Sequence, residues 1–367
     1  MRLLVIAPEV FESTGGIQLW NRVFLKALSE LNHEDGMRVE AISLNDSAKP
    51  RGQQRFFKDI SFRGMARSKF KMVLLSLLRS IKADVVILGH VSLAPLGLLY
   101  KIFRPALKYG IIVHGIEAWE ALPFAKRVSV CNADFIFSVS RFTAKRLADV
   151  NGVTKDKIHI LPNCLDPSFA DNRGAPTINP SFPKGRILLT VSRLDPSERY
   201  KGIAHVIMAM PKILPILPDV YYVIVGKGDD VKWLKSLCRV MGVSNHVIFT
   251  GYVSNEELPR YYKACEVFLL PSKKEGFGYV LLEAMWFKKP CIGARAGGIP
   301  EVVKDGETGV LVEYGNVEAI GNAIVSLLGD ETTRKRMSEE GHKRLVSEFT
   351  FDIYKQKLLH LMRNVRG

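Results

Sequence analysis

The chain has 367 residues, of which 47% are hydrophobic and 24% charged, which is ordinary for a globular protein and enough for two domains. No stretch offers the ~18–20 uninterrupted apolar residues of a membrane-spanning helix, and the apolar start is too short for a signal peptide, so we expect a cytoplasmic protein. The five cysteines are scattered without a C-x-x-C pair, which excludes an obvious disulfide framework or zinc site. The formal net charge is +15.

The first half of the chain alternates apolar runs with helical patterns. Apolar runs predict strands at residues 3–7, 39–44, 84–88, 111–113 and 134–138. Helices are predicted at residues 17–31 and 70–81, and the alternation as a whole predicts an open α/β domain. The loop after the first strand does not have the G-x-G-x-x-G pattern, so a dinucleotide fingerprint is absent.

The second half predicts another α/β domain. Residues 164–185 are rich in Pro, Asn, Asp and Gly without periodicity, and we interpret them as the linker. Strands are then predicted at residues 187–191, 221–225, 247–249, 267–270, 290–293 and 309–312, with helices between them. We therefore place one domain at residues 1–170 and the other at residues 171–349, with a helical tail.

One strand–turn–helix unit in this second domain has the composition of an anion site. The apolar run at 267–270 leads through Glu275, Gly276 and Gly278 into a helix that contains Glu283. The first N–H groups of a helix have no partner within it and attract anions, and glycines let a ligand approach the backbone. Carboxylates beside such a site can accept hydrogen bonds from sugar hydroxyls. The alternative is a capped surface helix with two solvated glutamates.

Two further features favour a ligand site. Gly297 and Gly298 form a second glycine loop that runs into another helix, with Pro300 near its start. Upstream, a predicted strand ends on Arg193, and Lys201 follows shortly. Two cations and two glycine loops at strand ends fit one pocket for a diphosphate.

Three motifs together resemble those of a known family. E-G-F-G-x-x-x-x-E at residues 275–283, G-G-I-P-E at 297–301 and S-R-L…Y-K-G at 192–202 resemble the retaining glycosyltransferases of the GT-B fold. The resemblance is strongest to glycosyltransferase family four, the glycogen-synthase-like "glycosyltransferases group one" class. It implies two Rossmann-like domains facing across a cleft, with a C-terminal helix, residues 350–367, that returns to the first domain.

The resemblance also implies an activity. The chain would move a sugar from a nucleotide-diphosphate sugar, UDP- or GDP-linked, to an acceptor hydroxyl with retention of anomeric configuration. The process would belong to polysaccharide, glycolipid or glycan assembly. No D-x-D pair is present, so we expect positive side chains in place of a metal, and no cofactor.

Residue roles follow from the same resemblance, position by position. Arg193 and Lys201 would stabilise the leaving diphosphate, and Glu275 would hold hydroxyls of the transferred sugar. Glu283 would hold the ribose, and His114 would contact the sugar from the first domain. Further donor contacts are implied at Gly15, Gly16, Gly226, Tyr252, Val253, Phe277 and Gly278. A lone histidine at a strand end can also be structural, and a Gly-Gly pair can be a simple tight turn.

Three other functions remain open. A nucleotide-sugar epimerase of the same fold would use the carboxylates for acid–base or elimination chemistry, which the pairing of two cations with two glutamates fits less well. A nicotinamide oxidoreductase is disfavoured by the missing fingerprint. A GT-B protein that binds nucleotide sugar without turnover is disfavoured because the complete set of catalytic residue types is present.

A basic segment stands apart from these motifs. From Arg51 to Lys82 there are nine basic residues and one acidic residue, Asp59. The helix predicted there has an apolar stripe at Met72, Leu75, Leu77 and Leu78. The combination resembles an interfacial helix on an anionic membrane, at ~1 kcal/mol per basic residue, with a sugar or lipid-linked acceptor. A solvated face above ordinary core leucines is the alternative, and no nucleic-acid module is visible.

Overall fold

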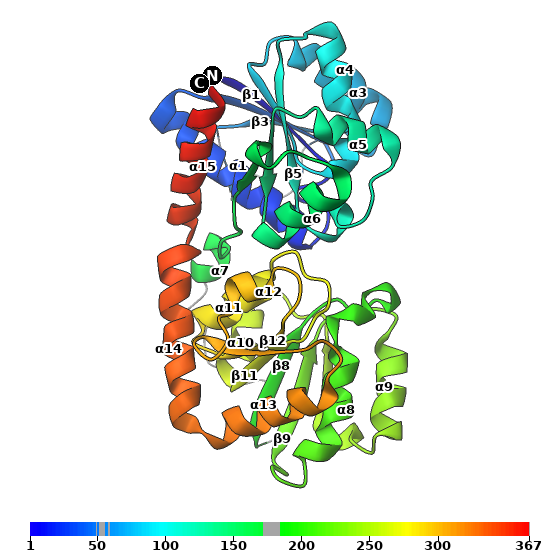
Figure 1. Ribbon diagram of the computed structural model, residues 1–367, viewed down its shortest axis with the longest axis vertical. Helices are drawn as coiled ribbons and strands as arrows, with labels where there is room; N and C mark the ends of the chain where they lie inside the picture. Colours follow the sequence, from blue (N-terminus) through cyan, green and yellow to red (C-terminus); the bar gives the residue numbers. More distant parts are fainter. Residues whose placement is uncertain (49, 51–55, 58, 172–183, 367) are drawn as a thin grey trace. The chain divides into compact units, whose positions relative to one another are not determined.

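The computed structural model describes residues 1–48, 50, 56–57, 59–171 and 184–366 (Figure 1). The chain divides into two compact units. The first comprises Met1–Asp166 together with Phe351–Gly367, and the second comprises Pro167–Thr350. Each unit is built on one parallel sheet with helices packed against it, so the predicted α/β class is confirmed.

The sheet of the first unit has seven strands in the order β3-β2-β1-β4-β5-β6-β7. The strands are β1 (Arg2–Ala7), β2 (Arg38–Ser43), β3 (Ser61–Gly64), β4 (Val85–Leu88), β5 (Lys108–Val113), β6 (Phe135–Ser138) and β7 (Ile158–Ile160). The five predicted strands are confirmed. The two missed strands, β3 and β7, are short, and polar residues interrupt their sequences, SFRG and IHI, so neither forms an apolar run.

The described residues of the first unit include six α-helices. They are α1 (Gly16–Asp35), α3 (Lys69–Ser80), α4 (Pro95–Phe103), α5 (Phe124–Cys131), α6 (Arg141–Asn151) and α15 (Phe351–Arg366). Short 3-10 turns lie at η1 (Val91–Leu93), η2 (Ile116–Ala118) and η3 (Lys155–Lys157). The predicted return of the C-terminal helix is confirmed, because α15 lies beside α1 (Figure 1) and buries Tyr354, Leu358 and Met362 in the first unit.

The sheet of the second unit has six strands in the order β10-β9-β8-β11-β12-β13. They are β8 (Arg186–Val191), β9 (Val220–Val225), β10 (Val247–Gly251), β11 (Val267–Leu270), β12 (Cys291–Ala294) and β13 (Gly309–Val312), and all six were predicted. The helices are α7 (Pro167–Asp171), α8 (Ile203–Ile213), α9 (Val231–Val240), α10 (Leu258–Ala264), α11 (Tyr279–Trp286), α12 (Ile299–Val302), α13 (Val317–Gly329) and α14 (Glu331–Glu348), with 3-10 turns η5 (Pro196–Lys201) and η6 (Ser244–His246).

The boundary between the units falls after Asp166 rather than after residue 170. Part of the predicted linker is the short helix α7, which begins the second unit. Phe169 of this helix is 5% exposed and meets the rings of Tyr262 and Phe287 edge-on, at centroid distances of 5.9 and 5.8 Å. This aromatic contact attaches α7 to the second unit. The remainder of the predicted linker, residues 172–183, lies outside the described residues.

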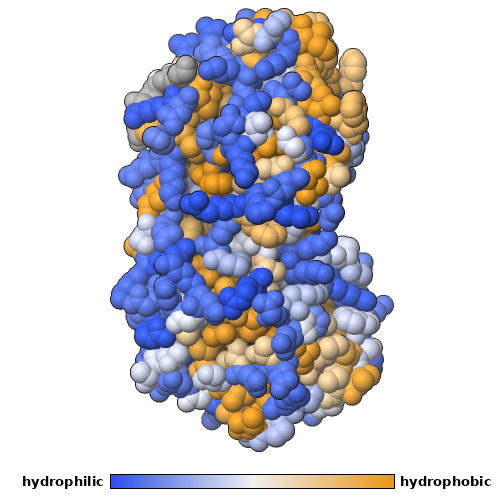
Figure 2. All heavy atoms as spheres, in the orientation of Figure 1, coloured by the Kyte–Doolittle hydropathy of each residue, from blue (hydrophilic) through white to orange (hydrophobic). Residues whose placement is uncertain are grey.

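Helix α3 presents apolar side chains on two faces. Met72 is buried, and Leu75 and Leu77 pack against the core of the first unit. The predicted interfacial stripe is therefore wrong for these three residues, because they face the sheet; Leu78 does lie outward, 56% exposed. An exposed apolar surface lies elsewhere on α3 and on the end of α4, and Figure 2 shows it as orange over these helices. Its members are Phe70, Leu74, Leu78, Ile81, Ile102 and Phe103.

The strand orders define where ligands can bind. The chain starts in the middle of each sheet and reverses its direction of growth, between β1 and β4 in the first unit and between β8 and β11 in the second. In open parallel sheets, ligands bind outside the carboxyl ends of the strands at such a switch point. In the described ranges, no helix combines the length and apolar character needed to cross a membrane.

Candidate functional site

The loops after β8 and β11 bring three predicted catalytic residues of the second unit together. Arg193 follows β8, and Lys201 ends the η5 turn that comes next. Lys201 Nζ donates to Glu275 Oε2 at 2.6 Å, and these side chains are 19% and 18% exposed. Arg193 forms an ion pair with Glu198 of the same turn. The switch point of this sheet therefore carries two cations, each matched by a carboxylate.

These four charges act on one neighbouring hydroxyl. Burial raises the pKa of Tyr200, the carboxylates of Glu198 and Glu275 raise it further, and the cations of Lys201 and Arg193 oppose them. Burial by itself would lower the pKa of Lys201, but the adjacent Glu275 carboxylate outweighs it, and the pKa is raised overall. Lys201 is consequently a cation throughout the physiological pH range.

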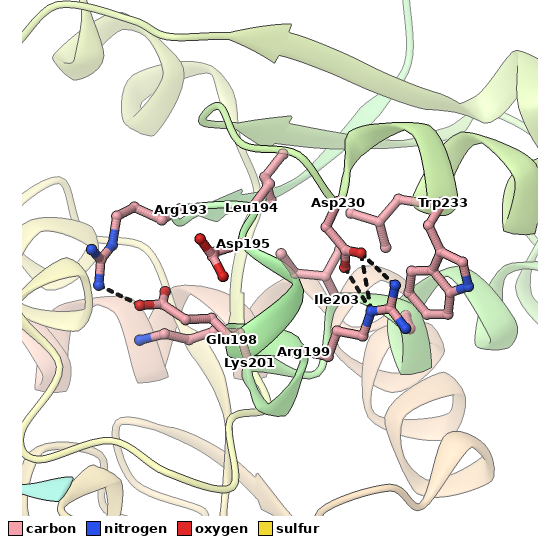
Figure 3. A pocket seen from close by; sticks show the side chains of 11 residues that line it. Arg193, Leu194, Asp195, Glu198, Arg199, Lys201, Ile203, Asp230 and Trp233 are labelled. Carbon is pink, nitrogen blue, oxygen red and sulfur yellow. Dashed lines mark hydrogen bonds and ion pairs between the residues drawn. The ribbon is translucent and has the colours of Figure 1, made fainter.

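The η5 turn directs its side chains to two sides (Figure 3). Glu198 and Lys201 lie on the side of Arg193, whereas Arg199 points toward Asp230 and Trp233. Arg199 donates from Nε and Nη2 to Asp230 Oδ1, at 3.0 and 2.6 Å, and its guanidinium carbon is 3.9 Å from the Trp233 ring centroid. The cavity between these groups has a volume of only about 20 Å³, room for about one water. It is a packing gap behind the cations rather than a nucleotide pocket.

The two predicted glycine loops touch each other. Gly278 caps the start of α11 with φ of 96°, in the left-handed region that favours glycine. The Gly298 N–H donates to Glu275 O at 2.7 Å, which joins the loops after β11 and β12. The ring of Phe277 is 3% exposed and packs edge-on against Phe349. Phe277 can thus offer its backbone to a ligand, while its side chain belongs to the core.

Glu283 is oriented by a residue that the sequence did not reveal. The Tyr262 hydroxyl, from α10, donates to Glu283 Oε2 at 2.7 Å. Burial, reinforced by the Glu283 charge, raises the pKa of Tyr262 well above its usual value. Tyr262 therefore remains a proton donor and fixes the carboxylate one turn into α11. The two residues are 21 positions apart and lie on different helices. Sequence periodicity relates positions within one helix, so it could not reveal this contact.

The remaining donor-binding candidates of the second unit lie at the ends of β9 and β10. The Gly226 N–H donates to Gly251 O at 2.9 Å. At Gly226, φ is 143° and a Cβ would lie 1.8 Å from a backbone oxygen of the loop after β8, so a side chain does not fit. Tyr252 and Val253 follow β10; the Tyr252 side chain is 60% exposed, and the Lys227 ammonium lies 5.2 Å from its ring centroid. All these groups share the carboxyl edge of the sheet.

In the first unit, His114 follows β5 and is held by two hydrogen bonds. Its Nε2 lies 2.8 Å from Gly89 O, and its backbone N–H donates to Glu117 Oε1 at 2.5 Å. A carbonyl oxygen only accepts, so the proton of the neutral ring is assigned to Nε2, and Nδ1 is left as an acceptor. Burial lowers the pKa of His114, with the Glu117 charge opposing, and the ring is neutral at pH 7.

A second histidine and the first glycine pair lie near His114. His90 stacks on His114 at a centroid distance of 6.0 Å and an interplanar angle of 19°. Gly15 and Gly16 begin α1, and Trp20 in its second turn meets the His114 ring edge-on at 5.2 Å. The predicted first-unit residues therefore gather at one edge of their sheet. His90 was not predicted as a site residue, although it follows a strand as His114 does.

We expect acid to destabilise the first unit through His90. Burial lowers the pKa of His90 to about 4. The charge of Glu117 opposes this shift, and the charges of His114 and Lys126 reinforce it. An unfolded histidine titrates near ~6.5. Between these values the unfolded chain binds more protons, so stability decreases as the pH falls from about 6.5 to about 4, by roughly 1–3 kcal/mol.

Chemical denaturation at pH 7 and pH 5 measures this change. His90→Gln should reduce the dependence of the free energy of unfolding on pH, and His360→Gln, on the exposed side of α15, is the control. An unchanged pH dependence in His90→Gln would contradict the assignment.

Comparison with protein families matches nearly the whole chain. The family described as "Glycosyl transferases group 1" matches residues 175–344, and "Glycosyltransferase Family 4" matches residues 15–169. A GDP-mannose-dependent alpha-(1-6)-phosphatidylinositol monomannoside mannosyltransferase of Mycolicibacterium smegmatis is 32% identical over 274 residues, which cover 70% of this chain and 71% of that protein. A glycogen synthase of Mycobacterium tuberculosis is 28% identical over 240 residues, or 65% of this chain and 53% of that protein.

Solved structures match the fold over its full length. Anabaena Alr3699/HepE in complex with UDP has a TM-score of 0.79 at 18% identity, and the match covers 99% of this chain and 100% of that one. Sucrose-phosphate synthase from Thermosynechococcus elongatus has a TM-score of 0.75 at 20% identity, with coverages of 99% and 98%.

Proposed function

We propose that this chain, which belongs to glycosyltransferase family four and is a glycosyltransferase of the predicted GT-B fold, transfers a hexosyl group with retention of configuration. The donor is a UDP- or GDP-linked sugar, and the acceptor offers a hydroxyl. The observation that carries this proposal is the pairing of Lys201 with Glu275 beside Arg193 at the switch point of the second sheet. The mannosyltransferase relative is named as GDP-mannose-dependent, and the Anabaena protein was solved with UDP, which supports these two donor classes.

The second unit has the charges that departure of a diphosphate requires. As the anomeric carbon–oxygen bond breaks, negative charge accumulates on the diphosphate, and Arg193 and Lys201 stabilise it. Attack occurs on the face that the diphosphate leaves: the acceptor oxygen bonds to the anomeric carbon, and its proton passes to the departing phosphate oxygen. Two cationic side chains, Arg193 and Lys201, supply the positive charge that a metal supplies elsewhere, and we propose that no metal or cofactor is required.

The carboxylates and the first unit hold the sugar and the nucleoside. Glu275 accepts hydrogen bonds from hydroxyls of the transferred sugar, and Glu283, oriented by Tyr262, accepts them from the ribose. His114 contacts the sugar from the first unit as a neutral ring. These roles distinguish transfer from the alternative of an epimerase, in which a carboxylate would remove a proton or assist elimination.

A screen of UDP-, GDP- and ADP-sugars against lipid-linked and soluble acceptors, read by mass spectrometry, tests the function. We expect transfer from a UDP- or GDP-sugar, persistence in EDTA, and the α-linkage of an α-linked donor preserved in the product by NMR. Epimerised donor without transfer would favour the isomerase, and tight donor binding without turnover would favour a binding protein. Loss of activity in EDTA that Mg²⁺ or Mn²⁺ restores would show that the diphosphate site is misassigned.

Removing either cation should slow turnover. Arg193→Ala and Lys201→Ala are each expected to lower kcat by roughly 10²-fold or more, typical for one lost transition-state donor. Arg186→Ala is a matched control, because Arg186 pairs with Asp219 at the opposite end of β8, and it should retain activity. A folded Arg193→Ala enzyme with normal kcat would remove Arg193 from the mechanism.

The two glutamates should have separable effects. Glu283→Gln should weaken the binding of the nucleotide sugar and of the free nucleoside diphosphate alike, because both ligands contain the ribose that Glu283 contacts. Glu275→Gln should reduce transfer without weakening the binding of the nucleoside diphosphate, because Glu275 contacts the sugar and neutralises Lys201. Calorimetric titration of each variant with UDP and GDP measures the split. Equal loss of nucleotide affinity in both variants is the result that contradicts it.

We further propose that the acceptor is a lipid-linked sugar or phospholipid on the cytoplasmic face of an anionic membrane. Four exposed basic residues lie in β3 and at the start of α3, next to the exposed apolar surface of α3 and α4. Arg63 is in β3, Arg67 just precedes α3, and Lys69 and Lys71 are in its first turn. Arg51, Arg55 and Lys58 lie outside the described residues. Exposed apolar side chains beside basic ones match a bilayer surface, into which apolar groups insert while Lys and Arg meet anionic headgroups.

Vesicle cosedimentation tests this surface. Binding should increase with anionic lipid content and decrease with salt, since the Debye length falls to ~3 Å at 1 M. Reversing the four basic residues to Glu, or changing Phe70 and Leu74 to Ser, should abolish it and leave nucleotide-sugar binding intact. Val240→Ser is the control, because Val240 is 83% exposed on α9 of the other unit. A wild-type chain that ignores anionic vesicles at low salt would favour a soluble acceptor.

A further inference from the structure

We infer that Glu198 is an intramolecular competitor of the diphosphate for Arg193, and that it sets the affinity for the nucleoside diphosphate and its release. The inference rests on the proposed function, because it takes Arg193 as a ligand of the diphosphate. Neither the motifs nor the family comparisons assign a role to Glu198. Its ion pair with Arg193 is the observation from which the inference starts.

The two partners of this ion pair differ in exposure. The Arg193 side chain is 72% exposed, whereas that of Glu198 is 12% exposed. The backbone of Glu198 is anchored, since its N–H donates to Asp195 O at 2.8 Å, and Asp195 Oδ1 also accepts from the Ser197 N–H at 2.9 Å. The carboxylate is therefore the fixed member and the guanidinium the movable one. Arg193 can leave Glu198 for another anion without any change in the turn.

The outer side of the turn holds it in place. Arg199 donates to Asp230 from Nε and Nη2, as described above, and Asp230 is 4% exposed. The Asp230 N–H donates to Leu194 O at 2.9 Å, so the residue after Arg193 is tied to the same anchor. Through these two contacts, Asp230 fixes the chain on both sides of Glu198. The anchored backbone keeps the Glu198 carboxylate within reach of Arg193 when a ligand arrives, so the two anions compete for the same cation.

The charges at the switch point balance. Arg193 and Lys201 carry two positive charges, and Glu198 and Glu275 carry two negative charges, so the diphosphate enters a site with no net charge from these four. Glu198 acts on both cations, since it pairs with Arg193 and also helps to raise the pKa of Lys201. Neutralising Glu198 would leave a net charge of +1, which attracts a diphosphate more strongly.

Such a competitor has a use in turnover. Cations that bind donor and product equally lower KM without raising kcat, and product release limits many enzymes. A carboxylate that pairs with Arg193 again after the reaction weakens the binding of the product nucleoside diphosphate and speeds its release. Glu198 is thus a positioning residue that acts through Arg193 and needs no contact with the substrate.

Calorimetric titration with UDP and GDP tests the competition. Glu198→Gln keeps the size and the hydrogen-bonding oxygen of the side chain but removes the charge. It should bind the nucleoside diphosphate roughly two- to fivefold tighter, the range for one solvent-accessible ion pair, and the gain should shrink as salt increases. Its kcat should fall, with slower release of the product nucleotide in a stopped-flow chase.

Two further variants isolate the pair. In an Arg193→Ala background, Glu198→Gln should tighten nucleotide binding much less than it does in the wild-type chain, because the competition requires both partners. Asp219→Asn, which removes the carboxylate of the Arg186 pair at the other end of β8, should leave nucleotide affinity unchanged.

The outcomes separate this inference from the proposed function. If the wild-type chain binds neither UDP nor GDP, the proposed function fails. If it binds them and Glu198→Gln weakens binding as Arg193→Ala does, Glu198 only orients Arg193 and the competition is refuted. Unchanged affinity in Glu198→Gln likewise overturns the inference, and tighter binding that depends on Arg193 supports it.

Discussion

The ion pair between Lys201 and Glu275 joins the loops after β8 and β11, where the second sheet reverses its direction. Both side chains are largely shielded from water, and a shielded cation without a partner is costly, so neither loop can move independently of the other. The Gly298 N–H then ties the loop after β12 to the same point through Glu275 O. Three strand ends are thereby fixed around one charge pair, and Arg193, Gly278 and the start of α11 take their positions from it.

The sheets were largely predictable because of their burial. A parallel strand covered on both faces is a continuous apolar run. Such runs identified the six strands of the second unit, including the partly exposed β10, and the five inner strands of the first. β3 and β7 were missed because SFRG and IHI are short and interrupted by polar residues. Helix α7 was missed because five residues have too few positions for a helical period, and its place is decided by the contact of Phe169 with Tyr262 and Phe287.

The site was predictable in its charged residues and not in their partners. Arg193, Lys201 and Glu275 follow strand ends, and parallel topology brings strand ends together whatever the intervening helices do. Tyr262, which orients Glu283, comes from a helix whose rotation is set by core packing. Glu198 is the intermediate case: Asp195-Pro196-Ser197 is a turn signature, and a tight turn there directs Glu198 back toward Arg193.

Helix α3 shows why a correct segment can have its faces misassigned. Its sequence, KFKMVLLSLLRS, has apolar residues around most of its circumference, so periodicity does not say which of them face the sheet. The structure turns Met72, Leu75 and Leu77 inward and leaves Phe70, Leu74 and Leu78 outward. Burial of the first three side chains stabilises the packing of the helix on the first unit, whereas the outward three remain exposed and do not contribute to that packing. This is the surface for which we propose a membrane contact, because a bilayer with anionic headgroups offers a complement to both the apolar side chains and the lysines and arginines beside them.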